Sequence, residues 1–306
     1  MAFTDRIERL ESTTRGLPLL VKQPLLHTIE LNQGQLSRIT GGVINYLWCT
    51  LSAYHRGERF AQREDLVEAY GDWLLKLPNI TPNGLMLPKE PTALAYNNFH
   101  RMFAEVFVEL GLDRHFSHVQ FPINLRLVEG TPQAALDRRA RSATKLHSDI
   151  WAGDPAGAII AMLPLLGDVE RLRVEYFEPR EMPENLVRPL TDFAEGAEIA
   201  AQARRYSDGW CRGGLTLFDA YLLHQTQKPG PGLRLSLDFR CLARDQLASD
   251  GRPPPEPLKV LFPVDEWLDY GRGRLLVTKE PLAPFKGADR STVGYEVMFG
   301  TQALST

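Results

Sequence analysis

The sequence predicts an α+β fold, with helices in its first third and strands in its middle. Up to about residue 118, apolar residues recur at the three- and four-residue spacing of amphipathic helices. From Val119 onwards they alternate with polar residues, as in half-buried strands. The chain has 306 residues, 43% hydrophobic and 24% charged, which is enough for a substantial core. We expect a mainly helical support region at 1–118, a β core at 119–245 and an extension at 246–306 that packs on that core, together forming one compact domain.

The helical pattern of the first region falls into four segments. They are 5–11, 35–56, 63–77 and 91–112. Acidic residues begin the third segment, where they suit the helix dipole, and Gly111 is placed to end the fourth. The histidines of this region share no ligand spacing on one face and are interpreted as partly exposed or hydrogen-bonded; they are His27, His55, His100, His115 and His118.

Composition excludes several classes of function. The net charge of −3 gives no general attraction to nucleic acid or to anionic membranes, so neither is an expected partner. Three scattered cysteines form no Cys-x-x-Cys pair, which argues against structural zinc and makes a reducing cytoplasm the default location. The first residues lack an apolar signal core, and no apolar run has the length of a membrane span. A small-molecule substrate is the expected partner, and the composition allows a homo-oligomer.

The strand pattern of the middle region leaves three questions open. On the strand at 121–128, Asn124 and Arg126 share one face, which either contacts a ligand inside the fold or is the wet face of an edge strand. The polar link at 129–145, rich in arginine, is either a lid or a solvated charge run. On the strand at 171–179, Arg173 either pairs with Glu175 on its own face or faces a cavity and binds a substrate carboxylate. Further strands are expected at 156–166 and 214–224, with an acidic, proline-rich insertion between them at 179–203.

A potential metal site lies at residues 146–151, which alternate as a strand does. His147 and Asp149 would then point to the same side and offer an imidazole next to a carboxylate. The best third ligand downstream is His224. Two histidines and one carboxylate on one side of a metal form the ligand set of non-haem Fe(II) oxygenases.

A potential carboxylate site follows His224. Ten residues later, Arg234 and Ser236 share one face of another alternating strand. A guanidinium group next to a hydroxyl suits a carboxylate, because arginine can bind both oxygens at once.

This order of motifs, His-x-Asp, a distant His and then Arg-x-Ser, resembles the 2-oxoglutarate/Fe(II)-dependent dioxygenases over roughly 121–242. The resemblance implies a double-stranded β-helix core of the jelly-roll or cupin-like kind. It also implies that His147, Asp149 and His224 bind Fe(II), and that Arg234 and Ser236 bind the distal carboxylate of 2-oxoglutarate. With O2 these enzymes oxidise unactivated C–H bonds and release succinate and CO2. Related halogenases lack the carboxylate ligand, so Asp149 favours hydroxylation, desaturation or ring closure.

The substrate class follows less directly. A small polar metabolite, such as an amino acid or a natural-product intermediate, fits the absence of nucleic-acid motifs. Trp151 would share the face of the metal ligands, as an apolar wall of the site or as simple packing. Two other functions remain open: a metal-dependent cupin-type isomerase or hydrolase, and a β-helix binding protein without catalysis.

Overall fold

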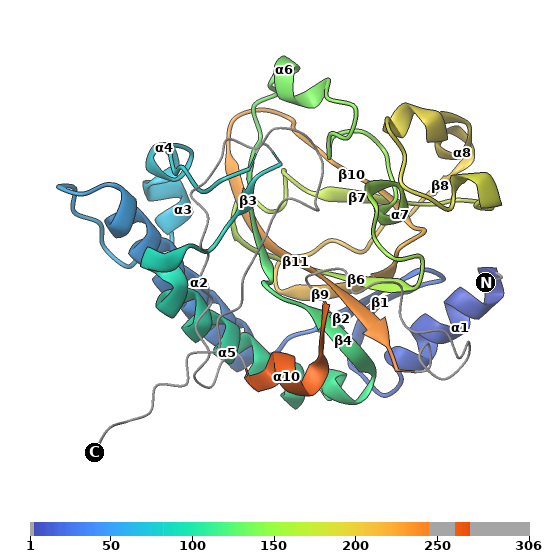
Figure 1. The fold of residues 1–306 in the computed structure, drawn as a ribbon, viewed down its shortest axis with the longest axis horizontal. Coiled ribbons are helices and arrows are strands. Elements are labelled where there is room, and N and C mark those ends of the chain that lie inside the picture. The colour runs from blue at the N-terminus through green and yellow to red at the C-terminus, as the bar shows by residue number, and fades with distance from the viewer. Residues whose placement is uncertain (1–2, 82, 245–260, 270–306) are drawn as a thin grey trace.

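A computed structural model describes residues 3–81, 83–244 and 261–269 of the chain. It combines helices with two antiparallel sheets, as the sequence predicts (Figure 1). The proline-rich stretch at 250–257, which the sequence predicts to be a stiff linker, and the aromatic residues Tyr270, Phe285, Tyr295 and Phe299 lie outside the described residues. No helix within the described ranges is long and apolar enough to cross a membrane.

The helices of the first region lie close to the predicted segments, with one exception. They are α1 (Phe3–Thr13), α2 (Gln33–Tyr54), α3 (Leu66–Ala69), α4 (Gly71–Leu74) and α5 (Ala93–Glu109). The single helix expected at 63–77 is wrong, because it breaks into α3 and α4 at Gly71. A Cβ atom on Gly71 would lie 2.5 Å from the side chain of Leu233, so the chain approaches a strand too closely there for most side chains.

Within the described residues, the larger sheet has nine strands, some of which the sequence did not predict. Its main order is β1 (Leu19–Gln23), β2 (Leu26–Glu30), β9 (Gly214–Asp219), β6 (Ala158–Gly167), β11 (Leu233–Ala243), β4 (Phe116–Gln120) and β12 (Leu261–Pro263); β5 (Asn124–Glu129) pairs with β11, and β3 (Leu85–Met86) with β5. Strands β1 and β2 come from the region read as mainly helical, so that region also extends the sheet.

The smaller sheet has the order β10 (Leu223–Thr226), β7 (Val174–Glu178) and β8 (Arg204–Arg205). The strand predicted at 214–224 is in fact two strands, β9 and β10, which belong to different sheets. The chain turns the corner between them at residues 220–222, where the amide of Leu222 donates to the carbonyl of Asp219 (2.9 Å). His224 therefore lies in the smaller sheet, while Arg234 and Ser236 lie in the larger one.

The strand predicted at 146–151 is wrong except at His147, which pairs as a strand residue does. His147 forms an isolated antiparallel bridge with His224, and the one-turn helix α7 (Asp149–Ala152) follows directly. The turn ends at Gly153, whose φ of 102° is a left-handed conformation that glycine adopts without strain. His147 and Asp149 thus lie on either side of a strand–helix junction.

Short helices also occur in the link and the insertion. They are α6 (Ala134–Asp137), α8 (Ala197–Gln202), α10 (Val264–Asp269) and the 3-10 turns Glu90–Thr92, Leu112–Arg114, Glu184–Leu186 and Phe193–Gly196. In α10, Trp267 is fully buried and its indole nitrogen donates to the carbonyl of Gln120 (2.9 Å). This part of the extension therefore packs on the core.

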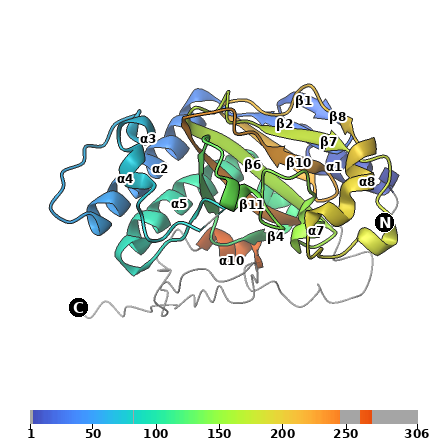
Figure 2. The same cartoon turned by 90° about the horizontal axis from the view of Figure 1, so that it is seen from above.

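Two apolar cores lie on the two sides of the larger sheet. One joins the sheet to α2 and α5, which lie side by side along its outer face (Figures 1 and 2). The other lies between the sheets and includes Met162 of β6, Tyr176 of β7 and Phe218 of β9. Beside this second core, the inner face of β11 is polar and buried, and the candidate site is built on it.

Candidate metal and carboxylate site

The two candidate histidine ligands lie next to each other. The amide of His224 donates to the carbonyl of His147 (2.7 Å), and the reverse bond measures 3.1 Å. Their ring centroids are 4.4 Å apart, and each residue is 7% exposed. The fold thus joins two residues that are far apart in sequence, as a shared site requires.

Backbone carbonyls orient both rings. Nδ1 of His147 donates to the carbonyl of Lys145 (2.7 Å), and Nδ1 of His224 donates to that of Leu222 (3.3 Å). Each ring is therefore left with an unprotonated Nε2, the arrangement usual in histidine metal ligands. Burial lowers the pKa of His147 to about 3, aided by His224, and the pKa of His224 to about 4. Both imidazoles are neutral at pH 7.

The third candidate ligand, Asp149, is 4% exposed and uses only one of its oxygens. Its Oδ1 accepts from Arg240 (2.8 Å), whereas its Oδ2 has no hydrogen-bond partner among the described residues and lies 3.7 Å from Nε2 of His224. A buried carboxylate oxygen without a partner is costly unless a cation meets it. In the part of the chain that the structure describes, no group of three His, Cys, Asp or Glu side chains already converges as a metal site. The donor types and the bare oxygen nevertheless fit a metal ion.

Arg234 is the least satisfied charge of the site. It is 1% exposed, donates to the carbonyl of Leu172 and leaves Nε without a partner. Its guanidinium lies 4.8 Å from the ring centre of Trp210, and it forms no ion pair with any described residue. Burial, aided by the charge of Arg126, lowers its pKa to about 9. Such a buried cation calls for an anionic ligand.

Two further groups lie on the inner side near Arg234. Ser236 is 1% exposed and pairs in register with Arg126 of β5, so these two side chains share a face. Tyr176, opposite His224 in the smaller sheet, is 2% exposed, and its hydroxyl is 3.7 Å from the sulfur of Met162. Burial raises the pKa of Tyr176, with Arg234 lowering it and Asp149 raising it. Tyr176 is thus near both halves of the site.

The remaining residues singled out from the sequence have diverse surroundings. Asn124 and Arg126 donate to the two oxygens of Asp238 (2.9 and 2.7 Å), so this face of β5 turns inward. Trp151 is fully buried in the core between the sheets, and a Cβ on Gly196 would lie 2.1 Å from its ring. Arg173 is half exposed on the surface and pairs with Glu175 (3.4 Å), as one of its two interpretations expects.

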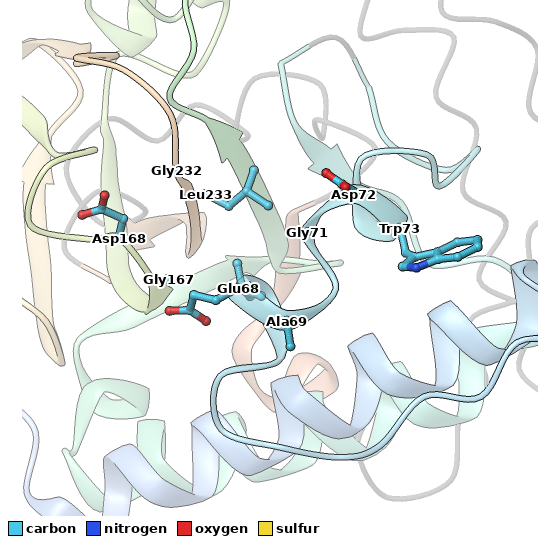
Figure 3. A pocket seen from close by; sticks show the side chains of 10 residues that line it. Glu68, Ala69, Gly71, Asp72, Trp73, Gly167, Asp168, Gly232 and Leu233 are labelled. Atoms are coloured by element: carbon cyan, nitrogen blue, oxygen red, sulfur yellow. The ribbon is translucent and has the colours of Figure 1, made fainter.

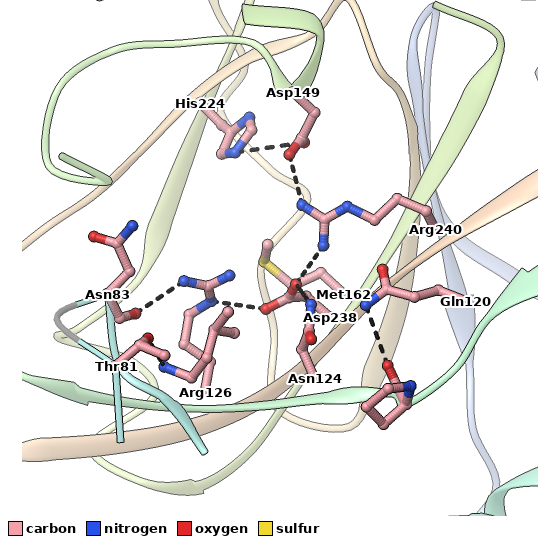
Figure 4. A network of polar contacts seen from close by, with 12 residues as sticks. Thr81, Asn83, Gln120, Asn124, Arg126, Asp149, Met162, His224, Asp238 and Arg240 are labelled. Carbon is pink, nitrogen blue, oxygen red and sulfur yellow. Dashed lines mark hydrogen bonds and ion pairs between the residues drawn. The ribbon is translucent and has the colours of Figure 1, made fainter. Parts of the chain in front are cut away.

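Sequence reasoning missed the centre of the polar network. Arg240 donates to Asp149, Asp154 and Asp238, and Figure 4 shows how these contacts continue through Arg126 to Asn83. The signal was available, because Asp238 and Arg240 continue the two-residue alternation of Arg234 and Ser236 along β11. Tyr176 had no such signal, since only the pairing of β7 with β10 brings it near.

A cavity of about 740 Å³ is lined by residues close in sequence to both histidines. Its wall includes Arg126, residues 142–144 and Thr226, and the amide of Thr226 donates to the carbonyl of Ala143 (2.8 Å). Residues of the 129–145 link form one rim, where Arg139 donates to the side chain of Asn83 on the opposite rim (2.7 Å). This cavity therefore reaches the polar network at Arg126.

A second cavity, of about 670 Å³, lies between α3, α4 and the ends of β6 and β11 (Figure 3). Its acidic side chains are Glu68, Asp72 and Asp168, and Asp168 pairs with Arg171 (3.1 Å). Neither cavity is lined by a candidate metal ligand or by Arg234, but of the two only the first is lined by Arg126 of the polar network. The cavity that Arg126 lines is therefore the better candidate for a substrate.

The insertion at 179–203 covers the metal side of the site. Phe193 stacks on the ring of His147, with centroids 4.5 Å apart and planes within 5°. The amide of Phe193 donates to Ala140 (3.1 Å), and Lys145 pairs with Asp192 (3.0 Å). These contacts hold the insertion against the segment that leads to His147 and shield that ring from water.

Comparison with known proteins gives a structural likeness only. No protein-family model matches the sequence, and no curated protein does. Among solved structures, the chain is similar to the non-haem alpha ketoglutarate dependent carbocyclase SnoK from nogalamycin biosynthesis, with 14% identity, 75% of this chain and 81% of that chain covered, and a TM-score of 0.36. For the epimerase SnoN from the same biosynthesis the values are 16%, 77%, 82% and 0.34. For an N-substituted L-amino acid dioxygenase from Burkholderia ambifaria they are 14%, 79%, 92% and 0.33. These proteins are non-haem or 2-oxoglutarate enzymes; at this level of likeness, function has to be judged from the site itself.

Proposed function

We propose that this protein is an Fe(II)- and 2-oxoglutarate-dependent oxygenase. The observation that carries the proposal is the presence of two buried, incompletely paired charges of opposite sign in the polar cluster around the inner face of β11. Asp149 presents a bare carboxylate oxygen next to a histidine nitrogen, and Arg234 presents a guanidinium without a carboxylate. A metal cation would pair with Asp149, and a dicarboxylate that chelates this metal would also pair with Arg234.

The charge balance of this polar cluster supports a divalent metal together with a dianion. With the histidines neutral, its charges are those of Arg126, Arg234, Arg240, Asp149, Asp154 and Asp238. These charges cancel, so a divalent cation alone would leave the cluster with a surplus of two positive charges. Adding 2-oxoglutarate, a dianion, restores neutrality and gives Arg234 its counter-ion.

The two-sheet arrangement supports a double-stranded β-helix as the catalytic core. The chain passes from β9 in the larger sheet to β10 in the smaller one and back to β11 in the larger one. The ligand-bearing segments therefore face each other across the space between the sheets. We place the core at 119–245, with the N-terminal helices outside it.

In this proposal His147, Asp149 and His224 bind Fe(II), and Arg234 with Ser236 binds the distal carboxylate of 2-oxoglutarate. When bound, iron, 2-oxoglutarate and O2 supply the oxidation of an unactivated C–H bond, with release of succinate and CO2. The chain itself orients the imidazoles through Lys145 and Leu222 and excludes water with the stacked ring of Phe193. Because Asp149 occupies the carboxylate position, hydroxylation is favoured over halogenation.

The substrate pocket in this proposal is the cavity of about 740 Å³ that Arg126 and Thr226 line, a size that suits a small metabolite. Its lining mixes apolar residues such as Leu87 and Val128 with polar ones such as Gln133. A small amphipathic molecule, such as an amino acid or a natural-product intermediate, fits this lining. The link at 129–145 is then its lid, and Arg126 lies at its inner end.

The test separates this proposal from its two rivals. A cupin-type isomerase or hydrolase would bind metal without 2-oxoglutarate, and a non-catalytic β-helix protein would bind neither. We expect one iron per chain and, on anaerobic titration with 2-oxoglutarate, a weak visible charge-transfer band. Iron without that band would favour the cupin reading, and absence of iron binding would reject the metal site altogether.

Alanine substitution of His147, Asp149 or His224 tests the three ligands one at a time. Each change should abolish turnover and weaken iron binding about 100-fold or more while the chain stays folded, because each removes a donor from a three-donor set. Asp149→Gly should also open a position for chloride. Iron content per chain and circular dichroism measure the two effects; full activity in any variant would remove that residue from the site.

A further inference from the structure

Arg240 is the most connected buried side chain near the candidate metal ligands, and the proposed chemistry does not use it. It is 6% exposed and donates to three carboxylates: to Asp154 through Nε (2.8 Å), to Asp238 through Nη1 (2.6 Å) and to Asp149 through Nη2 (2.8 Å). The side chains of these carboxylates are at most 5% exposed, so water does not replace the contacts. Figure 4 shows the contacts of Arg240 with Asp149 and Asp238. Each of the three guanidinium nitrogens therefore donates to a carboxylate.

Two of these carboxylates bracket the turn that carries the metal ligand. Asp149 opens α7 and Asp154 follows it, with the amide of Asp154 donating to the carbonyl of Asp149 (2.9 Å). Arg240 extends from β11 in the larger sheet and binds the side chains at both ends of this turn. The short helix is thereby attached to the most central strand of the site, and the position of Asp149 is fixed relative to that strand.

The same contact divides the two oxygens of Asp149 between two tasks. Oδ1 is occupied by Arg240, and Oδ2 is bare and faces Nε2 of His224. We infer that Arg240 is a positioning residue that makes Asp149 a one-oxygen metal ligand, by holding Oδ1 and aiming Oδ2 at the metal position. This inference rests on the proposed metal site.

A role through charge alone would have different consequences. As a cation next to the metal position, Arg240 repels a metal ion, so removing its charge would strengthen binding. As a positioning residue, it requires the planar fork, because lysine provides a single point of charge and cannot hold three carboxylates in the same geometry. Arg240→Lys therefore separates the two roles.

The experiment measures Co(II) binding to the metal-free full-length protein, without 2-oxoglutarate or turnover. For both Arg240→Lys and Arg240→Gln we expect affinity to fall roughly 10- to 100-fold, the usual effect of losing a partner that orients a ligand. The visible d–d bands of Co(II) should also shift, because Oδ1 becomes free to bind the ion. Wild-type affinity and bands in Arg240→Lys, or tighter binding in Arg240→Gln, would overturn the inference.

Two further variants keep the test valid should Arg240 variants unfold. Asp154→Asn removes one of the three carboxylates and should weaken Co(II) binding by a few-fold. Unchanged Co(II) affinity in this variant would count against the positioning role of Arg240. Arg9→Gln is the matched control, since Arg9 is a buried arginine whose partner Asp219 (2.7 Å) is not a candidate metal ligand and is also held by Arg6 (2.7 Å). It should lower stability and leave Co(II) affinity unchanged. If the parent protein binds no Co(II), the proposed metal site fails. If the parent binds Co(II) and the Arg240 and Asp154 variants bind it with the same affinity, the metal site stands and the role of Arg240 fails.

Discussion

Strand β11 has two buried faces of opposite chemistry. Its outer face, with Leu235, Leu237 and Phe239, packs in the apolar core against the helices. Its inner face, formed by Arg234, Ser236, Asp238 and Arg240, is buried to nearly the same degree.

Burying apolar side chains stabilises a fold, whereas burying charges costs free energy unless each finds a partner. Leucine at these positions would stabilise the fold more than the buried charges do. The inner face therefore indicates a binding function. Asp238 and Arg240 form ion pairs within the chain, whereas Arg234 forms none with the described residues. Substitutions on the inner face should change ligand binding, and those on the outer face should change stability.

Arg234 should show the largest effect on ligand binding. With iron content held equal, Arg234→Ala should raise the 2-oxoglutarate dissociation constant by about two to four decades. Loss of the ion pair with the buried carboxylate should cost about 3–5 kcal/mol of binding free energy. Arg234→Lys should lose less, since it keeps the charge without the fork. Anaerobic titration of the charge-transfer band measures the constants.

The same residue gives a second, opposite effect on stability. Without any ligand, Arg234→Met should leave the free energy of unfolding unchanged or raise it by about 1–4 kcal/mol, because an uncompensated buried charge is replaced by an apolar side chain. Denaturant unfolding of the ligand-free protein measures this. A folded Arg234→Ala that binds 2-oxoglutarate as tightly as the parent would show that Arg234 does not hold the carboxylate of the cosubstrate.

Phe239→Ala tests the outer face. Phe239 is fully buried, with its ring 5.3 Å from that of Phe103 on α5. Truncation should lower the free energy of unfolding by about 3–5 kcal/mol through lost burial and the cavity left behind. The affinities for Co(II) and 2-oxoglutarate should stay within about twofold of the parent values in conditions where the variant is folded. A large loss of affinity would show that the two faces are not independent.

Acid should destabilise the fold through histidines remote from the site. Burial lowers the pKa of His27 and of His100 to about 4, from about 6.5 in an unfolded chain. Their neutral forms are the folded ones, so this stability is fully present above pH 6.5 and is lost as the pH falls toward 4. At pH 5 each should cost about 2 kcal/mol. Denaturant unfolding across pH 5–7 measures the slope, and His100→Gln should reduce it; a flat profile would contradict the buried neutral state.

The sequence predicted the architecture where periodicity was uniform. Helices α2 and α5, the buried strand β6 and the alternation of β11 follow from local patterns, since each is decided by its own burial. The segment at 146–151 failed because its alternation spans a junction. One bridge at His147 is followed by a turn, which Gly153 and the contacts of Arg240 stabilise.

The site was predictable in its residue types but not in its connections. The neighbourhood of His147 and His224 depends on a bridge between distant segments, and the corner at 220–222 moves His224 into the second sheet. Arg240 could have been found by following the polar face of β11 two residues further. Tyr176 and Phe193 could not, because their places near the site depend on the pairing of β7 with β10 and on how the insertion folds back.

Ser236→Ala should give the smallest effect and so sharpens the contrast with Arg234. Its hydroxyl is neutral, and it shares the inner face of β11 with Arg234. Loss of one neutral hydrogen bond to the cosubstrate carboxylate should cost about 1 kcal/mol, or roughly fivefold in the 2-oxoglutarate dissociation constant. Ser117→Ala is the matched control, because Ser117 is a buried serine of β4 whose hydroxyl donates to the carbonyl of Leu242 (3.1 Å). It should leave that constant unchanged. An equal loss in both variants would mean that the effect of Ser236 is a general loss of packing, and Arg234 would then hold the carboxylate without it.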